Sequence, residues 1–332
     1  MGMFFVCVVM GLVPMIVYAA MLWWIDHWER EPLWMVVGAF LWGAVPAVVV
    51  AGIMQVVTML ILFGKVDSDP TQITPQTRFL MVILAPLTEE ICKGALLGVI
   101  FLFFSREIDS VLDGLVYGAM IGFGFAAVEN IGYFFTIGSQ EPAALVPLIA
   151  LRAFAFGPIH AMFTGMTGLG FALARFQRNP FLKFVFPMLG LILAMLLHAT
   201  HNFFATLELP GIALAMLVNW SGIFWVGVLV IVSLLYQRRA IEQQMVEEVS
   251  LGVLTPAQAH NAASFGTMVW HGLFPFLFWL PPRSRSRKLN KLCADLAFKK
   301  HQLAKMGEEW GNHSAVEELR AQVAHMSQQA LA

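Results

Sequence analysis

Seven long apolar segments constrain the fold of this chain more than any other feature. An α-helix rises about 1.5 Å per residue, so roughly 20 apolar residues cross the hydrocarbon core of a bilayer, which is about 30 Å thick. Only helices and closed barrels satisfy their backbone hydrogen bonds there. The sequence therefore predicts an all-α, polytopic membrane protein with about seven transmembrane helices, at residues 3–25, 33–63, 79–104, 111–137, 146–174, 181–207 and 212–236.

The composition supports this fold class. Hydrophobic residues make up 59% of the 332 residues and charged residues only 12%, whereas soluble domains are about 45–50% apolar and about 25% charged. Because residues 1–20 lack a basic stretch ahead of the apolar run, we expect a retained first helix rather than a cleaved signal peptide. The three cysteines form no disulfide pattern. No nucleotide-binding loop is present, and we expect no nucleic acid among the partners.

Basic residues in the connecting loops predict the orientation. The loops after the second, fourth and sixth segments hold only Lys65 and Arg78. Because cytoplasmic loops carry the excess of Lys and Arg, we expect the N-terminus outside and the C-terminus in the cytoplasm. The basic residues of the other loops are Arg30, Arg106, Arg175, Arg178, Lys183, Arg238 and Arg239.

The chain after the last apolar segment has a different character. We expect residues 1–239 to form the transmembrane bundle carrying the active site, and residues 240–332 to form a cytoplasmic tail with amphipathic helices. Thr255 and Pro256 indicate a helix start, residues 292–305 have helical periodicity, and the chain after Met306 is polar enough to be disordered.

Two further features of the tail are less specific. Residues 269–280 are apolar but too short to span a membrane, so we expect an interfacial or packed segment. A basic cluster follows, which suits either anionic lipid of the inner leaflet or a solvated loop. Its members are Arg283, Arg285, Arg287, Lys288 and Lys291.

Adjacent acids in the third apolar segment are the first sign of function. A charged side chain inside a membrane costs about 3 kcal/mol even on lenient scales. Lys93 follows Glu89 by four residues and Glu90 by three, within reach of either on one helix face. Two adjacent acids cannot share one cation equally, so one carboxylate is left to act as a general acid or base. The alternative is a purely structural ion pair.

Three other apolar segments carry similar groups. Glu129 and Asn130 follow a glycine series that permits close helix approach, so Glu129 should face the bundle. His160, two residues after Pro158, is either an interhelical hydrogen bonder or a ligand. The glycines are Gly114, Gly118, Gly122 and Gly124.

A second histidine-containing segment is more specific. His198 and Asn202 share one helix face and His201 is partly offset from it, a pattern that suits a metal or an oxyanion and leaves open which histidine is primary. Counted at about 1.5 Å per residue from the helix ends, Glu90, Glu129, His160 and His198 fall in one layer of the membrane, which predicts one buried reaction centre.

Two charged residues receive other roles. Arg152, near the outer end of the fifth segment, is expected to snorkel toward the interface or to meet an acidic substrate group. Asp113 at the start of the fourth segment is expected to act as a cap or an interface residue.

Four motifs on successive segments together resemble the PrsW family of bacterial intramembrane proteases, which is related to the type II CAAX prenyl proteases. They are Glu-Glu-x-x-Lys at 89–93, Phe-x-x-x-Glu-Asn at 125–130, His160, and His-x-x-x-Asn at 198–202. The resemblance covers roughly residues 30–240. It implies hydrolysis of a peptide bond in a single-pass membrane protein of the bacterial plasma membrane. The family role it implies is the first cut of an anti-sigma factor.

The resemblance also implies roles for the site residues. Glu89 and Glu90 would activate water, while Glu129, His160 and His198, with Glu90, would bind a metal or orient water and stabilise the oxyanion. These ligands suit Zn²⁺ with an open water position, and they equally suit a metal-free glutamate base. The full set of expected catalytic residues is Glu89, Glu90, Lys93, Glu129, Asn130, His160, His198 and Asn202.

Two other classes share some of these features. A seven-helix, zinc-dependent lipid amide or ester hydrolase of the alkaline ceramidase kind would also bury histidines and acids. A transporter or scaffold could use Glu89, Lys93 and Glu129 as a proton relay, although the histidine-rich sixth segment argues against it. Lipid turnover without peptide cleavage would identify the first class, and proton-coupled uptake would identify the second. The oligomeric state is not evident from the sequence.

Overall fold

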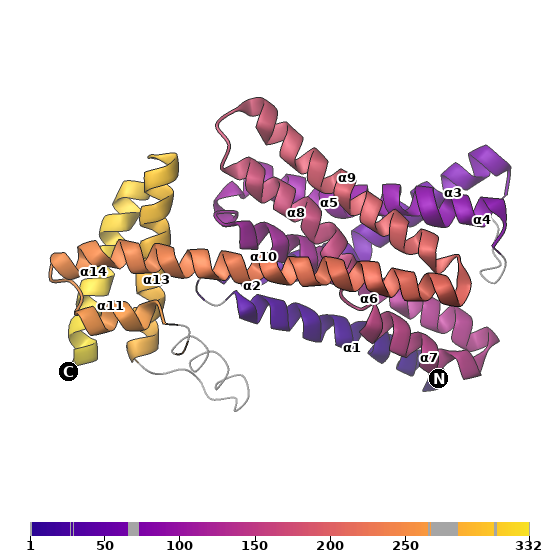
Figure 1. The fold of residues 1–332 in the computed structure, drawn as a ribbon, viewed down its shortest axis with the longest axis horizontal. Coiled ribbons are helices and arrows are strands. Elements are labelled where there is room, and N and C mark those ends of the chain that lie inside the picture. Colours follow the sequence, from indigo (N-terminus) through magenta and orange to yellow (C-terminus); the bar gives the residue numbers. More distant parts are fainter. Residues whose placement is uncertain are drawn as a thin grey trace. The chain divides into compact units, whose positions relative to one another are not determined.

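A computed structural model describes residues 2–26, 28, 30–65, 73–264, 266, 285–308 and 311–331. Every regular element in these residues is a helix (Figure 1), so the all-α prediction is confirmed. The chain divides into two compact units. The first comprises Met1–Leu22 and Glu31–Leu229, and the second comprises Trp23–Arg30 and Val230–Ala332.

Thirteen longer elements, several of them joined end to end, build the membrane-embedded part of the described chain. The labels η1, η2 and η5 mark stretches wound in the wider π register, in which the backbone bonds run from residue i to residue i+5. The elements are α1 (Gly2–Ile25), α2 (Leu33–Trp42), η1 (Gly43–Ala47), α3 (Val48–Phe63), α4 (Pro75–Phe79), η2 (Leu80–Leu84), α5 (Ala85–Phe103), α6 (Val111–Gln140), α7 (Leu145–Ile149), η5 (Ala150–Ala155), α8 (Ile159–Arg175), α9 (Pro180–Ala205) and α10 (Glu208–Ser250).

Six helical runs of the described chain are long and apolar enough to cross a membrane. They correspond to six of the seven expected spans. The remaining expected span is the continuous run α4–η2–α5, whose Glu89, Glu90 and Lys93 lower its hydropathy. The six runs are Gly2–Ile25, Leu33–Phe63, Val111–Gln140, Pro142–Arg175, Pro180–Ala205 and Leu209–Ser250.

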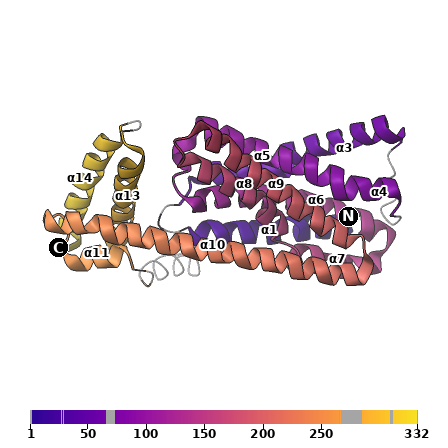
Figure 2. The same ribbon diagram turned by 45° about the horizontal axis from the view of Figure 1, so that its top comes forward.

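Helix α6 is the centre of the first unit. In its most apolar stretch 89% of the residues are buried, against 11–28% in the other five spans. It packs against α8, α2, η1 and α5, and α5, α6, α8 and α9 lie together in the bundle (Figure 2). A helix enclosed in this way can carry polar groups that lipid would not tolerate.

Small residues let α6 and α8 approach closely. A Cβ atom at Gly114 would collide with the carbonyl oxygen of Gly168, and one at Gly122 would collide with that of His160. The predicted close approach is confirmed, and the contact at Gly122 brings the start of α8 against α6 beside Phe125 and Glu129.

Prolines shape three of the helical runs. Pro46 lies inside η1, Pro86 follows η2, and Pro158 follows η5 at a break between residues 155 and 159. Proline has no N–H and cannot continue the α-helical bonding pattern, so the fifth span is interrupted at Pro158. His160 lies in the first turn of α8.

Capping at the ends of two helices agrees with the sequence. Ser110 and Asp113 form a capping box at the start of α6, so Asp113 is a cap. Thr255 and Pro256 begin α11 (Pro256–Ala262), where Thr255 forms a second capping box with Gln258.

The second unit contains the end of α10, α11, α13 (Arg285–Met306) and α14 (Asn312–Leu331). The charged stretch 241–249 is a continuation of α10 rather than a separate helix. Inside this unit Glu248 is fully buried and accepts hydrogen bonds from Lys300 Nζ at 2.7 Å and Arg320 Nε at 2.9 Å. Residues 269–280 and Arg283 lie outside the described residues.

The expected disorder after Met306 is wrong for the greater part of that segment. The structure forms α14 there, and Val316, Val323 and Met326 of this helix are buried. Their spacing of seven and three residues places them on one helix face. This face forms an apolar stripe, which the polar average composition of the segment does not reveal.

Candidate active site

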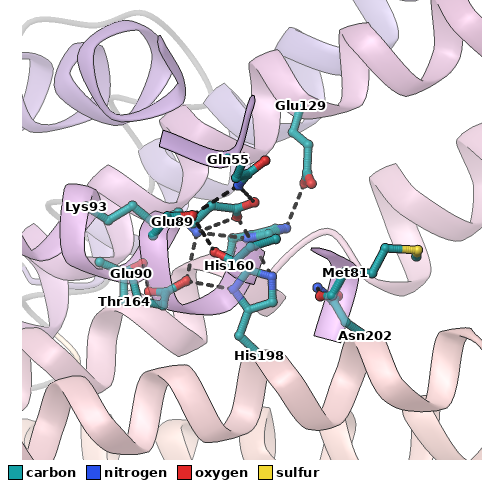
Figure 3. Close-up of polar contacts among 12 residues, drawn as sticks. Gln55, Met81, Glu89, Glu90, Lys93, Glu129, His160, Thr164, His198 and Asn202 are labelled. Atoms are coloured by element: carbon teal, nitrogen blue, oxygen red, sulfur yellow. Dashed lines mark hydrogen bonds and ion pairs between the residues drawn. The ribbon is translucent and has the colours of Figure 1, made fainter. Parts of the chain in front are cut away.

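The run α4–η2–α5 carries the two acids and the lysine, and Glu90 is the more firmly held acid (Figure 3). Its Oε1 lies 2.8 Å from Lys93 Nζ and 3.0 Å from His198 Nδ1, and its Oε2 accepts a hydrogen bond of 3.1 Å from Thr164 Oγ1. Both Glu90 and Lys93 are fully buried. Glu90 therefore joins α5 to α8 and α9.

Glu89 has a different environment. Its Oε1 accepts a hydrogen bond of 3.3 Å from Gln55 Nε2 on α3. Its Oε2 lies 3.5 Å from Lys93 Nζ and 3.8 Å from His198 Nε2, and it is buried without a hydrogen bond to any described residue. The two acids share the lysine unequally, as expected from their adjacency, and Glu89 is the one with an oxygen that lacks a hydrogen bond to the described residues.

The two histidines on α8 and α9 meet beside these acids. The rings of His160 and His198 lie 5.2 Å apart, edge to face. His160 contacts Lys93 Nζ through Nδ1 at 3.3 Å and Glu129 Oε2 through Nε2 at 2.9 Å. Stacking of Phe163 on His198, with centroids 5.1 Å apart, orients the second ring.

Arg152 belongs to the site, and the expectation that it snorkels is wrong. Its NH2 lies 2.8 Å from Glu129 Oε2, its Nε donates to Asn130 Oδ1 at 3.0 Å, and its guanidinium lies 3.8 Å from the ring centre of Tyr133. The π turn of η5 precedes Pro158, so Arg152 lies on a helical segment distinct from α8. An inward acid and an aromatic ring hold the cation in the bundle.

A cleft of about 560 Å³ opens onto these groups. Glu89, Glu129, Asn130 and His160 line it, as do Arg152, His201 and Asn202. Glu90, Lys93 and His198 are not among its lining residues, and they are buried behind it. The predicted residues therefore form two layers, one facing the cleft and one supporting it.

The structure separates the two histidines of the last motif. His198 joins the carboxylate cluster, whereas His201 Nδ1 lies 2.7 Å from Asn219 Nδ2 on α10. Asn202 donates a hydrogen bond of 2.7 Å to the carbonyl oxygen of Met81 in η2. Of His198 and His201, His198 is therefore the one that contacts the adjacent acids Glu89 and Glu90.

Sequence reasoning missed two site residues. Gln55 supports Glu89 from α3, and Thr164 supports Glu90 from α8. Gln55 is the only amide in the apolar segment 33–63, which was an available signal. Thr164 gave no signal, because a threonine in a membrane helix commonly bonds its own backbone.

The donor set fits a divalent metal. One ligand atom each from Glu89, His160 and His198 lie within 4.8 Å of one another, and all three residues are buried. Three carboxylates (Glu89, Glu90, Glu129) contact two cations (Lys93, Arg152), and within the described part of the chain Glu89 Oε2 has no hydrogen bond. The expected ligands were Glu90, Glu129, His160 and His198. The group in the structure keeps both histidines but has Glu89 as its carboxylate, because Glu90 and Glu129 bond to other side chains.

A helical, multi-pass membrane protein whose buried acids and imidazoles open onto a cleft has the architecture of an intramembrane hydrolase. Residues 31–236 match the family described as PrsW family intramembrane metalloprotease. The chain belongs to this family and is an intramembrane protease, as the motifs indicated. Membership favours proteolysis over lipid hydrolysis and transport.

Curated relatives support the assignment. The chain is 26% identical over 200 residues to Protease PrsW of Clostridioides difficile, covering 60% of this chain and 79% of the relative. It is 29% identical over 168 residues to Protease PrsW of Geobacillus kaustophilus, covering 50% and 65%. It is 25% identical over 198 residues to Protease PrsW of Bacillus subtilis, covering 59% and 81%. No solved structure matches the chain.

Proposed function

We propose that this protease hydrolyses a peptide bond of a single-pass membrane protein in the cleft, with Glu89 as the general base. One observation carries the proposal: Glu89 lines the cleft while its Oε2 is buried and without a hydrogen bond to the residues that the structure describes. A carboxylate oxygen at a cleft wall that accepts no hydrogen bond from the described residues, with Lys93 Nζ 3.5 Å away, is placed to accept a proton from water.

The surrounding residues suit this role. Gln55 holds Oε1 of Glu89, which leaves Oε2 to take a proton as water adds to the scissile carbonyl carbon. When the carbon–nitrogen bond breaks, Glu89 returns that proton to the leaving amine. Lys93 offsets the charge of both acids, and Glu90 fixes Lys93 and His198.

Two donors at the cleft wall suit the developing oxyanion. Arg152 lines the cleft, and Asn130 Nδ2 is buried without a hydrogen bond to the described residues. A preorganised donor that meets its acceptor only during the reaction lowers the barrier more than one already satisfied. We assign Asn130 to donating a hydrogen bond to the carbonyl oxygen as its negative charge develops. Arg152, which is already held by Glu129 and Asn130 Oδ1, contributes its positive charge beside that oxygen.

In an alternative, metal-dependent scheme we propose Zn²⁺ for the Glu89, His160 and His198 group, since two imidazoles and one carboxylate with an open position are a common catalytic zinc set. The ion would polarise the scissile carbonyl and promote ionisation of bound water. Glu89 would then be a ligand, and Glu129, on the cleft wall beside His160, would be the carboxylate left to move the proton.

We further propose that the protein lies in a bacterial plasma membrane, with its N-terminus outside and its C-terminus in the cytoplasm. The loop charges support this orientation, and the curated relatives named above are bacterial. Fluorescent-protein and alkaline-phosphatase fusions at the C-terminus test it: fluorescence without phosphatase activity is expected, and the reverse would contradict it.

Cleavage of a single-pass reporter peptide by purified protein in liposomes tests the function. Glu89→Gln is expected to lower the turnover rate by about 10²–10⁴-fold, with an unchanged unfolding temperature. Glu90→Gln is the matched comparison and should lower the unfolding temperature as well, because Glu90 joins three helices. Wild-type turnover by Glu89→Gln protein would refute the proposal.

Metal analysis separates the two schemes. If the metal scheme holds, the purified wild type retains zinc, and Glu89→Gln, His160→Ala and His198→Ala each lose it together with cleavage. Chelator-resistant cleavage by a metal-free wild type would instead identify Glu89 as the base acting alone.

A further inference from the structure

We propose that His201 binds the backbone of the peptide substrate, donating a hydrogen bond from Nε2 to a substrate carbonyl oxygen. This rests on the proposed function and adds a substrate-binding residue to it. His201 occupies an unspecified position of the His-x-x-x-Asn motif at 198–202, and it is not in the Glu89, His160 and His198 group.

The hydrogen bond to Asn219 determines which ring nitrogen carries the proton. His201 Nδ1 lies 2.7 Å from Asn219 Nδ2, and both residues are buried, with exposed fractions of 9% and 1%. An amide nitrogen only donates, so Nδ1 accepts. A neutral imidazole has one N–H, which is therefore on Nε2.

Aromatic contacts hold the ring in one orientation. Phe156 meets it edge-on with ring centroids 4.9 Å apart, and Phe163 lies 6.2 Å away on α8. Together with the hydrogen bond to Asn219, these two contacts leave the imidazole little freedom to rotate. A donor held in this way is preorganised for a ligand.

The N–H on Nε2 of His201 has no hydrogen-bond partner among the described residues, although His201 lines the cleft. Inside a membrane, an N–H without an acceptor is costly. An extended peptide in the cleft has backbone carbonyls that need donors for the same reason. The neighbouring amide of Asn202 is already bonded to Met81, so at this point of α9 the imidazole is the available donor.

The composition of the cleft around His201 favours a peptide. Its other lining residues there include Phe156, Ala205, Ile212 and Ala215, which suit apolar side chains of a membrane-embedded substrate. A volume of about 560 Å³ is within the range of small-ligand sites and accommodates a short peptide segment. One polar contact in an apolar cleft fixes the register of a substrate.

A purely structural role predicts a different outcome. In that case His201 would serve only to join α9 to α10 through Asn219, as interhelical hydrogen bonds do in membranes. The two roles use different nitrogens of one ring. Asn and Gln differ by one methylene, so an Asn at this position places its amide near the site of Nδ1, and a Gln places it near the site of Nε2.

The experiment uses these two substitutions, because each one retains the polar atom near one ring nitrogen and loses the one near the other. KM and kcat for the reporter peptide, and the unfolding temperature, are measured for His201→Asn and His201→Gln, with Thr200→Ala on the same helix as control. His201→Asn should keep the unfolding temperature and raise KM about tenfold, as for one lost hydrogen bond. His201→Gln should lower the unfolding temperature and keep KM within about twofold. Among the described residues, the hydroxyl of Thr200 bonds the carbonyl of Leu196 in its own helix and no other group, so the control should change neither the unfolding temperature nor KM.

The binding constant of the same peptide for Glu89→Gln protein, with and without His201→Asn, separates this inference from the proposed catalysis. Weaker binding in the double variant supports the role of His201 even if Glu89 is not the base. A wild-type KM for His201→Asn, or stability losses in both variants with unchanged KM, would overturn it.

Discussion

Asn202 Nδ2 on α9 lies 2.7 Å from the carbonyl oxygen of Met81 in η2. In this π-wound stretch the Ala85 N–H bonds the carbonyl of Leu80, so the carbonyl of Met81 would pair with the N–H of residue 86. Residue 86 is proline and has none. The side chain of Asn202 supplies the missing donor and fixes the helical run that carries Glu89 and Glu90. Asn202 is among the expected catalytic residues, and from this contact we expect it to act as a positioning residue.

Replacing Asn202 should affect stability and catalysis together. Asn202→Ala leaves the carbonyl of Met81 without a donor, which costs about 1 kcal/mol in a membrane protein. We expect a lower unfolding temperature and a lower kcat, because the start of α5 shifts. Thr200→Ala is the control. An unchanged unfolding temperature with lost activity would show that Asn202 contacts the substrate instead.

Gln55 should control the orientation of Glu89. Its Nε2 donates to Glu89 Oε1 at 3.3 Å and to Thr88 Oγ1 at 3.2 Å. Gln55→Leu removes both bonds and should lower kcat about tenfold with little change in KM, because the carboxylate loses its fixed orientation. Gln55→Glu should lower kcat further than Gln55→Leu does, since it adds a negative charge beside Glu89.

Steady-state cleavage of the reporter peptide gives kcat and KM for both Gln55 variants and the wild type. Thr58→Ala, on the same helix, is the control and should retain wild-type values. Equal kcat values for Gln55→Leu and the wild type would show that Glu89 is held by other contacts.

The glycine at the α6–α8 contact should tolerate no side chain. A Cβ at Gly122 would collide with the carbonyl oxygen of His160, whereas one at Gly132 on the same helix would meet no atom within 4 Å. Gly122→Ala should destabilise the protein by about 1–3 kcal/mol and displace His160. Gly132→Ala should be neutral or slightly stabilising. Thermal unfolding in detergent compares the pair, and equal transitions would refute the close contact.

The tail cysteine should resist alkylation. Cys293 is fully buried in the second unit, and burial, with smaller contributions from Glu248 and Asp295, raises the pKa of its thiol to about 12. The thiolate is the reactive form, so at pH 8 its fraction is about a thousandfold lower than at the ordinary pKa of 9. Iodoacetamide labelling followed by mass spectrometry should show slow modification in the native protein and rapid modification after unfolding. Rapid labelling of native protein would contradict the burial of this thiol.

The sequence by itself determined the helical membrane fold and most of the site. Apolar length defines a span because lipid offers the backbone no hydrogen bonds, and six spans agree with the described helices. Acids and histidines in lipid are costly, so the sequence identified Glu89, Glu90, His160 and His198 as candidate site residues before any contact was known.

Only the tertiary structure decided which groups meet. The free oxygen of Glu89, the support from Gln55 and Thr164, and the inward position of Arg152 depend on side chains from α3, α8 and η5. Their sequence separations from their partners range from 23 to 74 residues, and helical periodicity relates only residues a turn or two apart. The same limit concealed the different partners of His198 and His201, because their positions on one helix turn did not reveal that Glu90 lies beside His198 and Asn219 beside His201.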